Sequence, residues 1–252
     1  MKTIVPILLA AGEGKRMRST LPKVLHQVGG KPMIRRVMEA AALPGAEPPV
    51  VVVGHRAGEL QAALGPAARY ALQREQLGTG HAVMCAEEFL KAPTGAPKEG
   101  CALVVAGDMP LLTQKTLQAL VDEQQKTGAA LVFLSAVLKD PTGYGRVVRD
   151  EQGRLKGIVE QKDATEKERA ICEVNTLVYC LDIPRLLWAL RQLTTENAQN
   201  EYYLTDCVKL FVDHNMGVEA LPAADPDECL GVNTPEELAH CDAICRARGE
   251  RG

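Results

Sequence analysis

The sequence contains no long hydrophobic run. No segment approaches the ~18 consecutive apolar residues that a membrane-spanning helix requires, and the first apolar stretch, residues 4–11, contains Pro6 and leads directly into a glycine-bearing loop. The sequence therefore predicts neither a transmembrane helix nor a signal peptide. Internal repeats and low-complexity segments are also missing, and 46% hydrophobic with 24% charged residues is ordinary for a globular protein. We expect a cytoplasmic protein with no membrane partner.

Closely spaced cysteine pairs are lacking as well. The chain has 8 cysteines but no C-x-x-C pair, and the two nearest in sequence, Cys241 and Cys245, fall in a segment that we expect to be helical. Without a secretion signal, a disulfide framework is not expected. We interpret these cysteines as small buried side chains or unused thiols rather than zinc ligands.

Two familiar phosphate-binding loops are absent too. A dinucleotide fingerprint requires G-x-G-x-x-G, but Met17 stands at the third glycine position. A P-loop requires G-x-x-x-x-G-K-[ST], but the Gly-Lys pair at residues 30–31 is followed by Pro32, and Leu25 occupies the first glycine position. A nucleotide site in this chain must therefore be of another kind.

The N-terminal region does contain a cationic glycine loop. Residues 8–19 read LLAAGEGKRMRS, an apolar strand that leads into Gly12 and Gly14. Such glycines let the backbone approach phosphate oxygens, while Lys15, Arg16 and Lys23 supply positive charge. Residues 13–36 hold seven Lys or Arg and one acid, although the whole chain has a net charge of -3. Because the positive charge is local, we expect a small polyanion such as a nucleoside triphosphate, not a nucleic acid. The alternative is a glycine turn whose cations only face solvent.

Short apolar runs alternate with helical patterns along the chain. Residues 4–9, 50–53, 102–105 and 131–137 are too short for core helices and are typical of buried strands. Apolar stripes within residues 33–41 and 204–212 predict helices, and a capping box that starts at Thr234 predicts a terminal one. Residues 92–100 predict a surface loop. This alternation predicts an α/β fold with a Rossmann-like, mostly parallel sheet and helices on both faces.

Asp108 stands at the tip of one predicted strand. It follows the run ALVVAG at residues 102–107 and precedes Met109-Pro110, which places its carboxylate on a turn. Ligands bind outside the carboxyl ends of the strands in such sheets, and Mg²⁺ takes one or two hard oxygen ligands beside phosphates. Asp108 is therefore a candidate magnesium ligand, or alternatively the cap of the helix that follows Pro110.

Several separated motifs together resemble one enzyme family. In chain order they are LAAG (9–12) with Arg16-Met17 and LPKVLH (21–26), QREQLGTGHA (73–82), GDMP (107–110), DPTGYGR (140–146), IVE (158–160) with KDA (162–164), EVNT (173–176), NEYYLTD (200–206) and GVN (231–233). This order resembles the uridylyltransferase domain of the bacterial N-acetylglucosamine-1-phosphate uridyltransferases (GlmU). The resemblance spans nearly the whole chain.

The resemblance implies a fold of the nucleotide-diphospho-sugar transferase type and a defined reaction. The phosphate oxygen of N-acetylglucosamine 1-phosphate would attack the α-phosphorus of UTP in line, with Mg²⁺ as cofactor, to give UDP-N-acetylglucosamine, a cell-wall peptidoglycan precursor, and pyrophosphate. Both reactants are anions, so catalysis would depend on orientation and on electrostatic stabilisation by cations.

The resemblance also implies roles for individual residues. Arg16 and Lys23 match the catalytic cations, and Asp108 and Asn233 match the metal ligands. Three further groups match the family's sugar contacts: the backbone N–H of Gly145, the carboxylate of Glu160 and the amide of Asn175.

The nucleotide contacts implied by the resemblance form a larger set. In it, the side-chain amide of Gln73 can offer a donor and an acceptor to the uracil edge. The residues are Leu9, Ala10, Ala11, Gly12, Gly14, Lys23, Gln73, Gly78 and Thr79.

Three residues depart from the family pattern. Lys15 stands where many members have Thr, Ala106 replaces an aromatic residue, and Leu177 replaces a glycine. Ala106 and Leu177 lie near the expected sugar pocket, so they leave the identity of the sugar substrate open. Alternatives are another pair of substrates, such as glucose 1-phosphate with UTP or dTTP or a methylerythritol phosphate with CTP, and a non-catalytic sensor of UDP-sugars. A sensor would have lost a metal ligand or a triphosphate cation, and the sequence retains them.

Bifunctional family members continue into a β-helix of hexapeptide repeats that performs acetyl transfer and forms trimers. The sequence ends at Gly252, so we expect no acetyltransferase domain and, without a trimerising segment, a monomer. We expect a single nucleotidyltransferase domain at 1–233, with its nucleotide-binding part at about 1–112 and its sugar-binding part at about 113–233, and a terminal helix and tail at 234–252.

Overall fold

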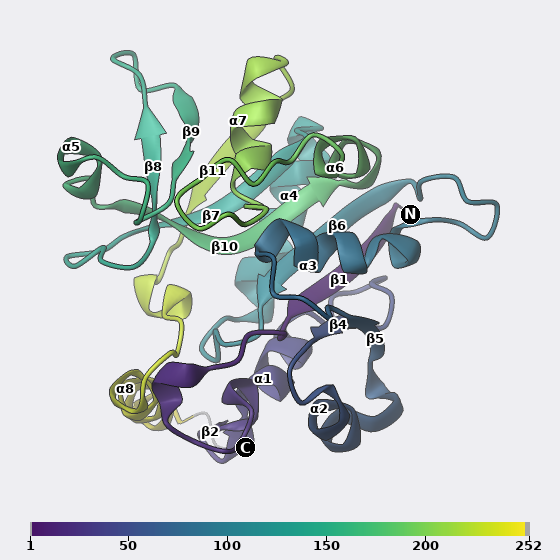
Figure 1. Cartoon of the computed structure of the whole chain (residues 1–252), viewed down its shortest axis with the longest axis vertical. Coiled ribbons are helices and arrows are strands. Elements are labelled where there is room, and N and C mark those ends of the chain that lie inside the picture. The colour runs from purple at the N-terminus through teal and green to yellow at the C-terminus, as the bar shows by residue number, and fades with distance from the viewer. Residues whose placement is uncertain (1, 250–252) are drawn as a thin grey trace.

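A computed structural model describes residues 2–249 of the chain, and its main feature is a nine-stranded sheet (Figure 1). The strands of this sheet are β1 (Thr3–Leu9), β4 (Val50–Val53), β5 (Arg69–Leu72), β6 (Gly100–Ala106), β7 (Leu131–Val137), β8 (Gly145–Arg149), β9 (Leu155–Val159), β10 (Glu173–Asp182) and β11 (Val218–Pro222). The short strands β2 (Gln27–Val28) and β3 (Lys31–Pro32) pair with each other outside it.

The sheet is largely parallel, as the sequence predicts. Its order is β11-β7-β10-β6-β1-β4-β5, and the β8–β9 hairpin joins it through β10. β1 is parallel to β4 and β6, β4 to β5, and β7 to β11. β10 is antiparallel to both β6 and β7, so all strands of this path except β10 point the same way. The four predicted runs all form strands of this path, because their side chains are buried on both faces.

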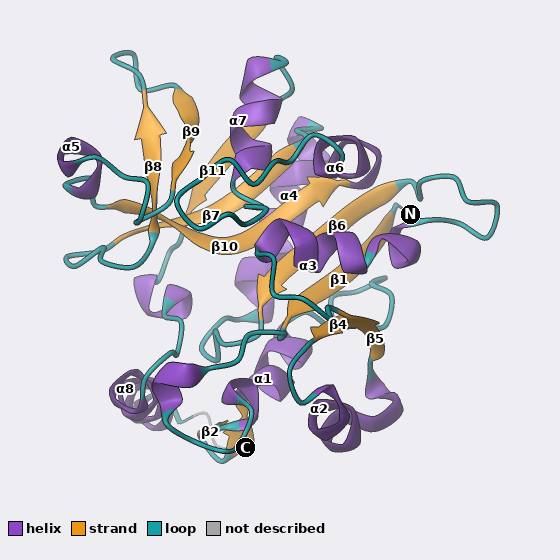
Figure 2. Cartoon of the chain, in the orientation of Figure 1, coloured by secondary structure: helices purple, strands orange, loops and turns teal. Residues whose placement is uncertain are grey.

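Helices cover both faces of the sheet (Figure 2), which confirms the predicted architecture. One face packs against α1 (Met33–Ala40), α2 (Ala57–Leu64) and α4 (Gln114–Thr127). The other packs against α3 (Thr79–Cys85), α6 (Ile183–Leu190) and α7 (Asp206–Asp213). The short helix α5 (Glu166–Arg169) follows the β8–β9 hairpin. Single 3-10 turns occur at Lys15–Met17, Lys23–Leu25, Gly65–Ala67, Glu87–Leu90 and Pro226–Cys229.

The terminal helix α8 (Pro235–Ala247) lies against the N-terminal loops (Figure 1). It begins at the predicted capping box. In this box the Thr234 side chain accepts from the Glu237 N–H, and the Glu237 side chain accepts from the Thr234 N–H. Cys241 and Cys245 are buried beside Met17, as small hydrophobic side chains. Residues 250–252 of the predicted tail lie outside the described residues.

The predicted loop before β6 and the second predicted helix both form, but with slightly different ends. Residues 92–99 form the expected loop, and Gly100 already begins β6. The second apolar stripe is helical over Asp206–Asp213, but Leu204 at its start precedes the helix. Leu204 is nevertheless buried, because its backbone N–H donates to Thr79 Oγ1 at 3.0 Å and holds the segment against α3.

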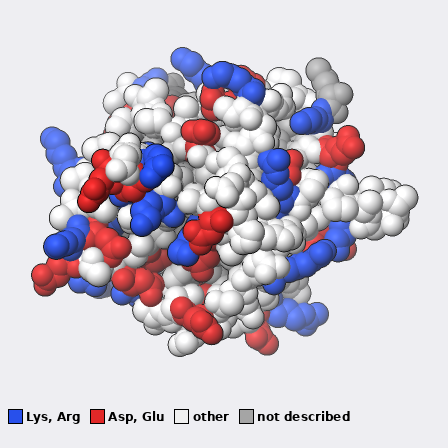
Figure 3. Space-filling model, turned by 90° about the horizontal axis from the view of Figure 1, so that it is seen from above, with Lys and Arg blue, Asp and Glu red and all other residues white. Residues whose placement is uncertain are grey.

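On the face drawn in Figure 3, acidic and basic side chains are mixed rather than separated by sign. Within residues 2–249, no helix is both long and apolar enough to cross a membrane.

Candidate active site

Two adjoining cavities open beside the carboxyl ends of β1 and β6. One has a volume of about 280 Å³ and the other about 270 Å³. Four residues line both of them: Thr79, Ala106, Asp108 and Leu177. Two ligands in these cavities would therefore meet at the tip of β6.

The first cavity collects the predicted nucleotide contacts. Gln73 follows the carboxyl end of β5, and its side chain is only 4% exposed. Gly78 has φ +100° at the start of α3, where a Cβ would lie 2.7 Å from the Tyr202 carbonyl oxygen. A side chain is therefore excluded at this turn. The predicted residues that line this cavity are Leu9, Ala10, Ala11, Gly12, Lys23, Gln73, Gly78 and Thr79.

Gly14 and Lys15 have different places from those that the sequence suggested. Gly14 has φ +64°, and a Cβ there would lie 2.7 Å from the Cβ of Lys23. Among the described residues it is not part of either cavity wall, and it instead allows Lys23 to pack behind the loop. The Lys15 side chain is 84% exposed and pairs with Glu13 at 2.5 Å, so the expectation that it supplies charge to the phosphates is not supported.

Lys23 joins the two predicted metal ligands. Its ammonium donates to Asp108 Oδ2 in an ion pair and to Asn233 Oδ1 at 2.9 Å. The side chains of Lys23 and Asp108 are only 13% and 19% exposed, so water screens this contact little. Residues that are 210 positions apart in sequence thus share one charged cluster.

Backbone contacts hold Asp108 and Asn233 in place. The Val232 N–H donates to the Asp108 carbonyl oxygen at 2.9 Å. Glu237 in the first turn of α8 accepts from the Asn233 N–H at 2.6 Å. The alternative role of Asp108 as a helix cap is wrong, because Thr113 caps α4.

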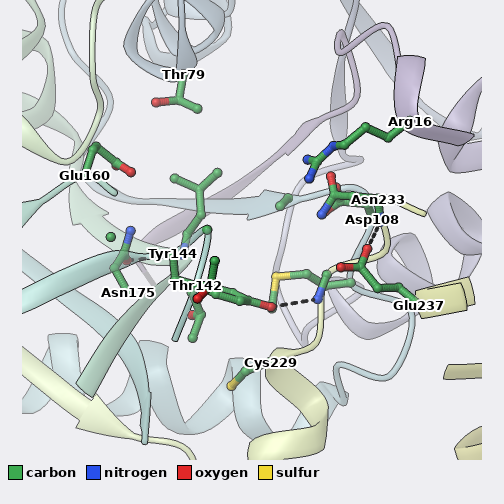
Figure 4. Close-up of a pocket in the computed structure, with 17 residues that line it drawn as sticks. Arg16, Thr79, Asp108, Thr142, Tyr144, Glu160, Asn175, Cys229, Asn233 and Glu237 are labelled. Carbon is green, nitrogen blue, oxygen red and sulfur yellow. Dashed lines mark hydrogen bonds between the residues drawn. The ribbon is translucent and has the colours of Figure 1, made fainter. Parts of the chain in front are cut away.

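The second cavity collects the predicted sugar contacts (Figure 4). Glu160 and Asn175 lie on one side of it, facing Arg16, Asp108 and Asn233 on the other side. Arg16 lines this cavity beside the predicted metal ligands, so its guanidinium is placed to contact a phosphate group bound there.

The Glu160 carboxylate is held by a hydrogen bond, and burial changes its pKa. Thr205 Oγ1 donates to Glu160 Oε1 at 2.9 Å. Burial raises the pKa of Glu160, and nearby Asp206 adds to this effect. At Gly145 a Cβ would lie 2.8 Å from Ile158 and 3.4 Å from Glu160 Oε2, so glycine leaves the backbone and the carboxylate open to a ligand.

The Asn175 amide is oriented by its own strand. Its Oδ1 accepts from the Leu177 N–H at 3.2 Å, and the residue is 5% exposed. With the carbonyl oxygen engaged in this way, the NH₂ group is the part of Asn175 available to a ligand.

The chain matches a known protein family. The family described as the MobA-like NTP transferase domain matches residues 6–173. The chain belongs to this family. The match includes the glycine loop, Asp108 and Glu160, and it ends just before Asn175.

Curated relatives confirm the resemblance of this NTP transferase domain to the GlmU family. The chain is 45% identical over 249 residues to the bifunctional protein GlmU of Caldanaerobacter subterraneus subsp. tengcongensis, 46% over 250 residues to that of Thermoanaerobacter pseudethanolicus, and 48% over 244 residues to that of Trichlorobacter lovleyi. These matches cover 96–98% of this chain and 52–53% of the relatives. The chain thus spans about half the length of the curated relatives it matches.

The predicted metal-ligand pair, Asp108 and Asn233, fits a divalent cation. The oxygens of Asp108 and Asn233 already converge on one positive group, the Lys23 ammonium. One anionic and one neutral oxygen ligand would leave a bound Mg²⁺ ion with net positive charge and with positions for phosphate oxygens and water.

Tyr144 and Glu237 also line the sugar-side cavity, although the sequence did not predict them as site residues. Tyr144 lies inside the DPTGYGR motif and Glu237 inside the capping box, so both belong to patterns that the sequence shows but that do not by themselves indicate a cavity wall. Ala106 and Leu177, which were expected near the sugar pocket, form the wall that the two cavities share. Leu177 has φ +59°, in the left-handed region that favours glycine.

Proposed function

We propose that this NTP transferase domain forms UDP-N-acetylglucosamine and pyrophosphate from UTP and N-acetylglucosamine 1-phosphate. The observation that carries the proposal is the meeting of two cavities of similar volume at Asp108. Predicted nucleotide contacts line one cavity, and predicted sugar contacts line the other. Arg16 and Lys23 add positive charge at this junction.

The reaction class follows from placing two anions at one junction. An oxygen of the sugar 1-phosphate attacks the α-phosphorus of UTP, the bond from that phosphorus to the β-phosphate oxygen breaks, and pyrophosphate leaves. Arg16 and Lys23 offset the repulsion between the reactants and stabilise the charge that develops on the transferred phosphoryl group. The cavity walls hold the reacting atoms in line, which replaces a costly bimolecular encounter.

A divalent metal is the cofactor that nucleotidyltransferases of this kind generally use, and we propose Mg²⁺. Asp108 and Asn233 would hold it, with Glu237 keeping the Asn233 backbone in place. When bound, the ion supplies charge neutralisation and orientation to the phosphates.

Sugar selection rests on three groups of different chemistry. The Gly145 N–H can donate to a sugar oxygen, the Glu160 carboxylate can accept from hydroxyls, and the Asn175 NH₂ can donate to an acetamido or hydroxyl oxygen. A hexose 1-phosphate with an N-acetyl group fits this set of donors and acceptors.

Pyrophosphate release tests the proposal. The purified chain is incubated with Mg²⁺ and UTP together with N-acetylglucosamine 1-phosphate, glucose 1-phosphate or N-acetylgalactosamine 1-phosphate, and CTP and dTTP replace UTP as nucleotide controls. Release with UTP and N-acetylglucosamine 1-phosphate is expected. Release with a different pair would retain the chemistry but change the substrates, and no release over the panel would favour the sensor.

Other expectations remain predictions. They are the division into nucleotide-binding and sugar-binding parts near residue 112, the cytoplasmic location, the absence of nucleic-acid and membrane partners, and the monomeric state. A sedimentation mass of twice or three times 27.2 kDa would contradict the last of these.

A further inference from the structure

The Gln73 side chain presents one defined end to the nucleotide cavity. Its Nε2 donates to the Gly78 carbonyl oxygen at 3.0 Å and lies 3.2 Å from His81 Nδ1. A carbonyl oxygen can only accept, so the nitrogen of the Gln73 amide must face Gly78. Both N–H bonds are then used inside the protein, while no group within residues 2–249 donates to Gln73 Oε1.

His81 completes this arrangement from the first turn of α3. Because Gln73 Nε2 can only donate, His81 Nδ1 must offer its lone pair, and the ring proton of the neutral imidazole must be on Nε2. That nitrogen faces Cys85 Sγ at 3.9 Å, where it meets a weak acceptor. Tyr202 lies beside the ring, with centroids 6.3 Å apart.

A free carbonyl oxygen distinguishes between pyrimidines. Uracil carries an N–H at ring position 3, which pairs with an acceptor, whereas cytosine carries a lone pair there, which is repelled by one. An amide turned the other way would present its NH₂ group and could bind either base. The orientation of one side chain therefore decides the selection.

We propose that His81 is a positioning residue that holds the Gln73 carbonyl oxygen toward the nucleobase, so that the site selects uracil over cytosine. His81 is not among the residues that line the nucleotide cavity, so it acts through Gln73. The inference rests on the proposed function, because it assumes that this cavity receives a pyrimidine nucleotide.

Steady-state kinetics of two substitutions test this role. His81→Leu removes the acceptor, whereas His81→Asn places a side-chain oxygen near the position of Nδ1. With N-acetylglucosamine 1-phosphate and Mg²⁺, we expect the ratio of kcat/KM for UTP to that for CTP to fall about tenfold in His81→Leu, the size of one lost hydrogen bond. His81→Asn should restore the ratio to within about threefold of the unsubstituted protein.

Two controls separate positioning from a general structural effect. The base of dTTP has the same ring edge as uracil, so the ratio of UTP to dTTP should not change in His81→Leu. Met84→Leu alters the same helix without a polar contact and should leave the ratio of UTP to CTP unchanged. An equal loss for UTP and CTP in His81→Leu, or an equal change in Met84→Leu, would overturn the proposal.

The ring proton can be located without any substitution in the measured protein. In the long-range ¹H–¹⁵N spectrum, the His81 ring should be the tautomer with its proton on Nε2, and His81→Asn serves only to assign the signal. A proton on Nδ1 would overturn the inference even if His81→Leu did not fold. The inactivity of the unsubstituted protein with UTP and every sugar 1-phosphate would refute the proposed function instead, and this spectrum would still test the His81 contact.

Discussion

Lys15 and Lys23 show that one cationic loop contains side chains with different surroundings. Lys15 is 84% exposed and pairs with Glu13, whereas Lys23 is 13% exposed and donates to Asp108 and Asn233. A charge near the surface is screened by water and contributes little, but one held in a shielded site acts strongly on a neighbouring anion.

Lys23→Ala is therefore expected to lower turnover by at least ~100-fold, the scale of removing one preorganised electrostatic partner. Circular dichroism should show that the fold persists. Lys15→Ala serves as the matched control from the same loop and should stay within about threefold of the unsubstituted protein. Unchanged turnover in Lys23→Ala would remove this residue from the site.

Burial of the Glu160 carboxyl group lowers the stability of the folded protein near neutral pH. Burial raises the pKa of Glu160 above its ordinary value of 4.5. Below that ordinary value the carboxyl is protonated in both folded and unfolded chains. As the pH rises through the raised pKa of the folded protein, the group must ionise where it is shielded from water, and stability is lost.

Glu160→Gln should therefore raise the Tm near neutral pH by about 2–4 °C, which corresponds to ~1 kcal/mol in a chain of this size. The difference should shrink as the pH falls toward 4.5, the ordinary value. The same substitution should raise KM for the sugar 1-phosphate, because an acceptor for hydroxyls becomes weaker. Thermal denaturation from about pH 5 to 8 checks this, and Glu166→Gln on exposed α5 is the control. A pH-independent Tm difference would contradict it.

At the scale of elements, a buried arginine anchors the loop that borders the sugar-side cavity. Arg146 on β8 is 1% exposed, and its guanidinium donates to the Tyr144 carbonyl oxygen and, at 2.6 Å, to Gln161 Oε1. The same Gln161 oxygen accepts from the Gly143 N–H at 3.2 Å. Residues 142–145 all line the cavity, so this arrangement sets one of its walls.

Arg146→Met should still fill the buried space of the side chain, but it removes the hydrogen bonds that hold residues 142–145 in place. We expect kcat/KM for the sugar 1-phosphate to fall ~10-fold or more, since small misplacements of substrate have large effects on rate. KM for UTP should change by less than about threefold, because the nucleotide cavity uses other loops. Arg149→Met, farther along β8 and exposed, is the control. Equal losses for both substrates would indicate general misfolding.

Helix α8 illustrates a local signal with a distant consequence. The sequence contains the capping box at Thr234, and the structure confirms it. Glu237 in that box also accepts from the Asn233 N–H, and α8 packs on the N-terminal loops, so the capping residue also holds the backbone of a predicted metal ligand. The capping box can be found in the sequence because it depends only on the spacing of residues. The contact with the Asn233 backbone serves the site only because the fold places this helix beside it.

At the scale of the whole molecule, segments from residue 9 to residue 237 build the site together. The unfolded chain has no such arrangement, so a ligand that binds here stabilises the folded state in proportion to its occupancy. With Mg²⁺ and UTP at 100 times Kd, this gives about 2.7 kcal/mol and a rise in Tm of about 5–10 °C. A chelator should abolish most of the rise, and CTP should give less. A rise of equal size with Mg²⁺ alone would contradict this prediction, which differential scanning fluorimetry checks.

The chain by itself determined part of the fold, including four of the nine strands of the sheet, and the kind of chemistry. Short buried runs such as Val50–Val53, the apolar stripe at Met33–Ala40 and the cap at Thr234 depend on neighbours in sequence, and all formed as expected. The motif order also indicated Asp108, Asn233, Glu160 and Asn175, and these side chains do line one cavity. Helices, strands and caps can be predicted because they depend on residues close together in sequence. The site residues could be indicated because their motifs occur together in a recognisable order.

Only the tertiary structure decided which groups face one another. It placed Lys23 beside Asp108 and Asn233, turned Lys15 outward, and directed the amide nitrogen of Gln73 to the Gly78 carbonyl oxygen. It also brought the terminal helix back to the N-terminal loops. These outcomes depend on packing between segments far apart in sequence, where burial and the direction of single hydrogen bonds decide the result, and no local pattern encodes either.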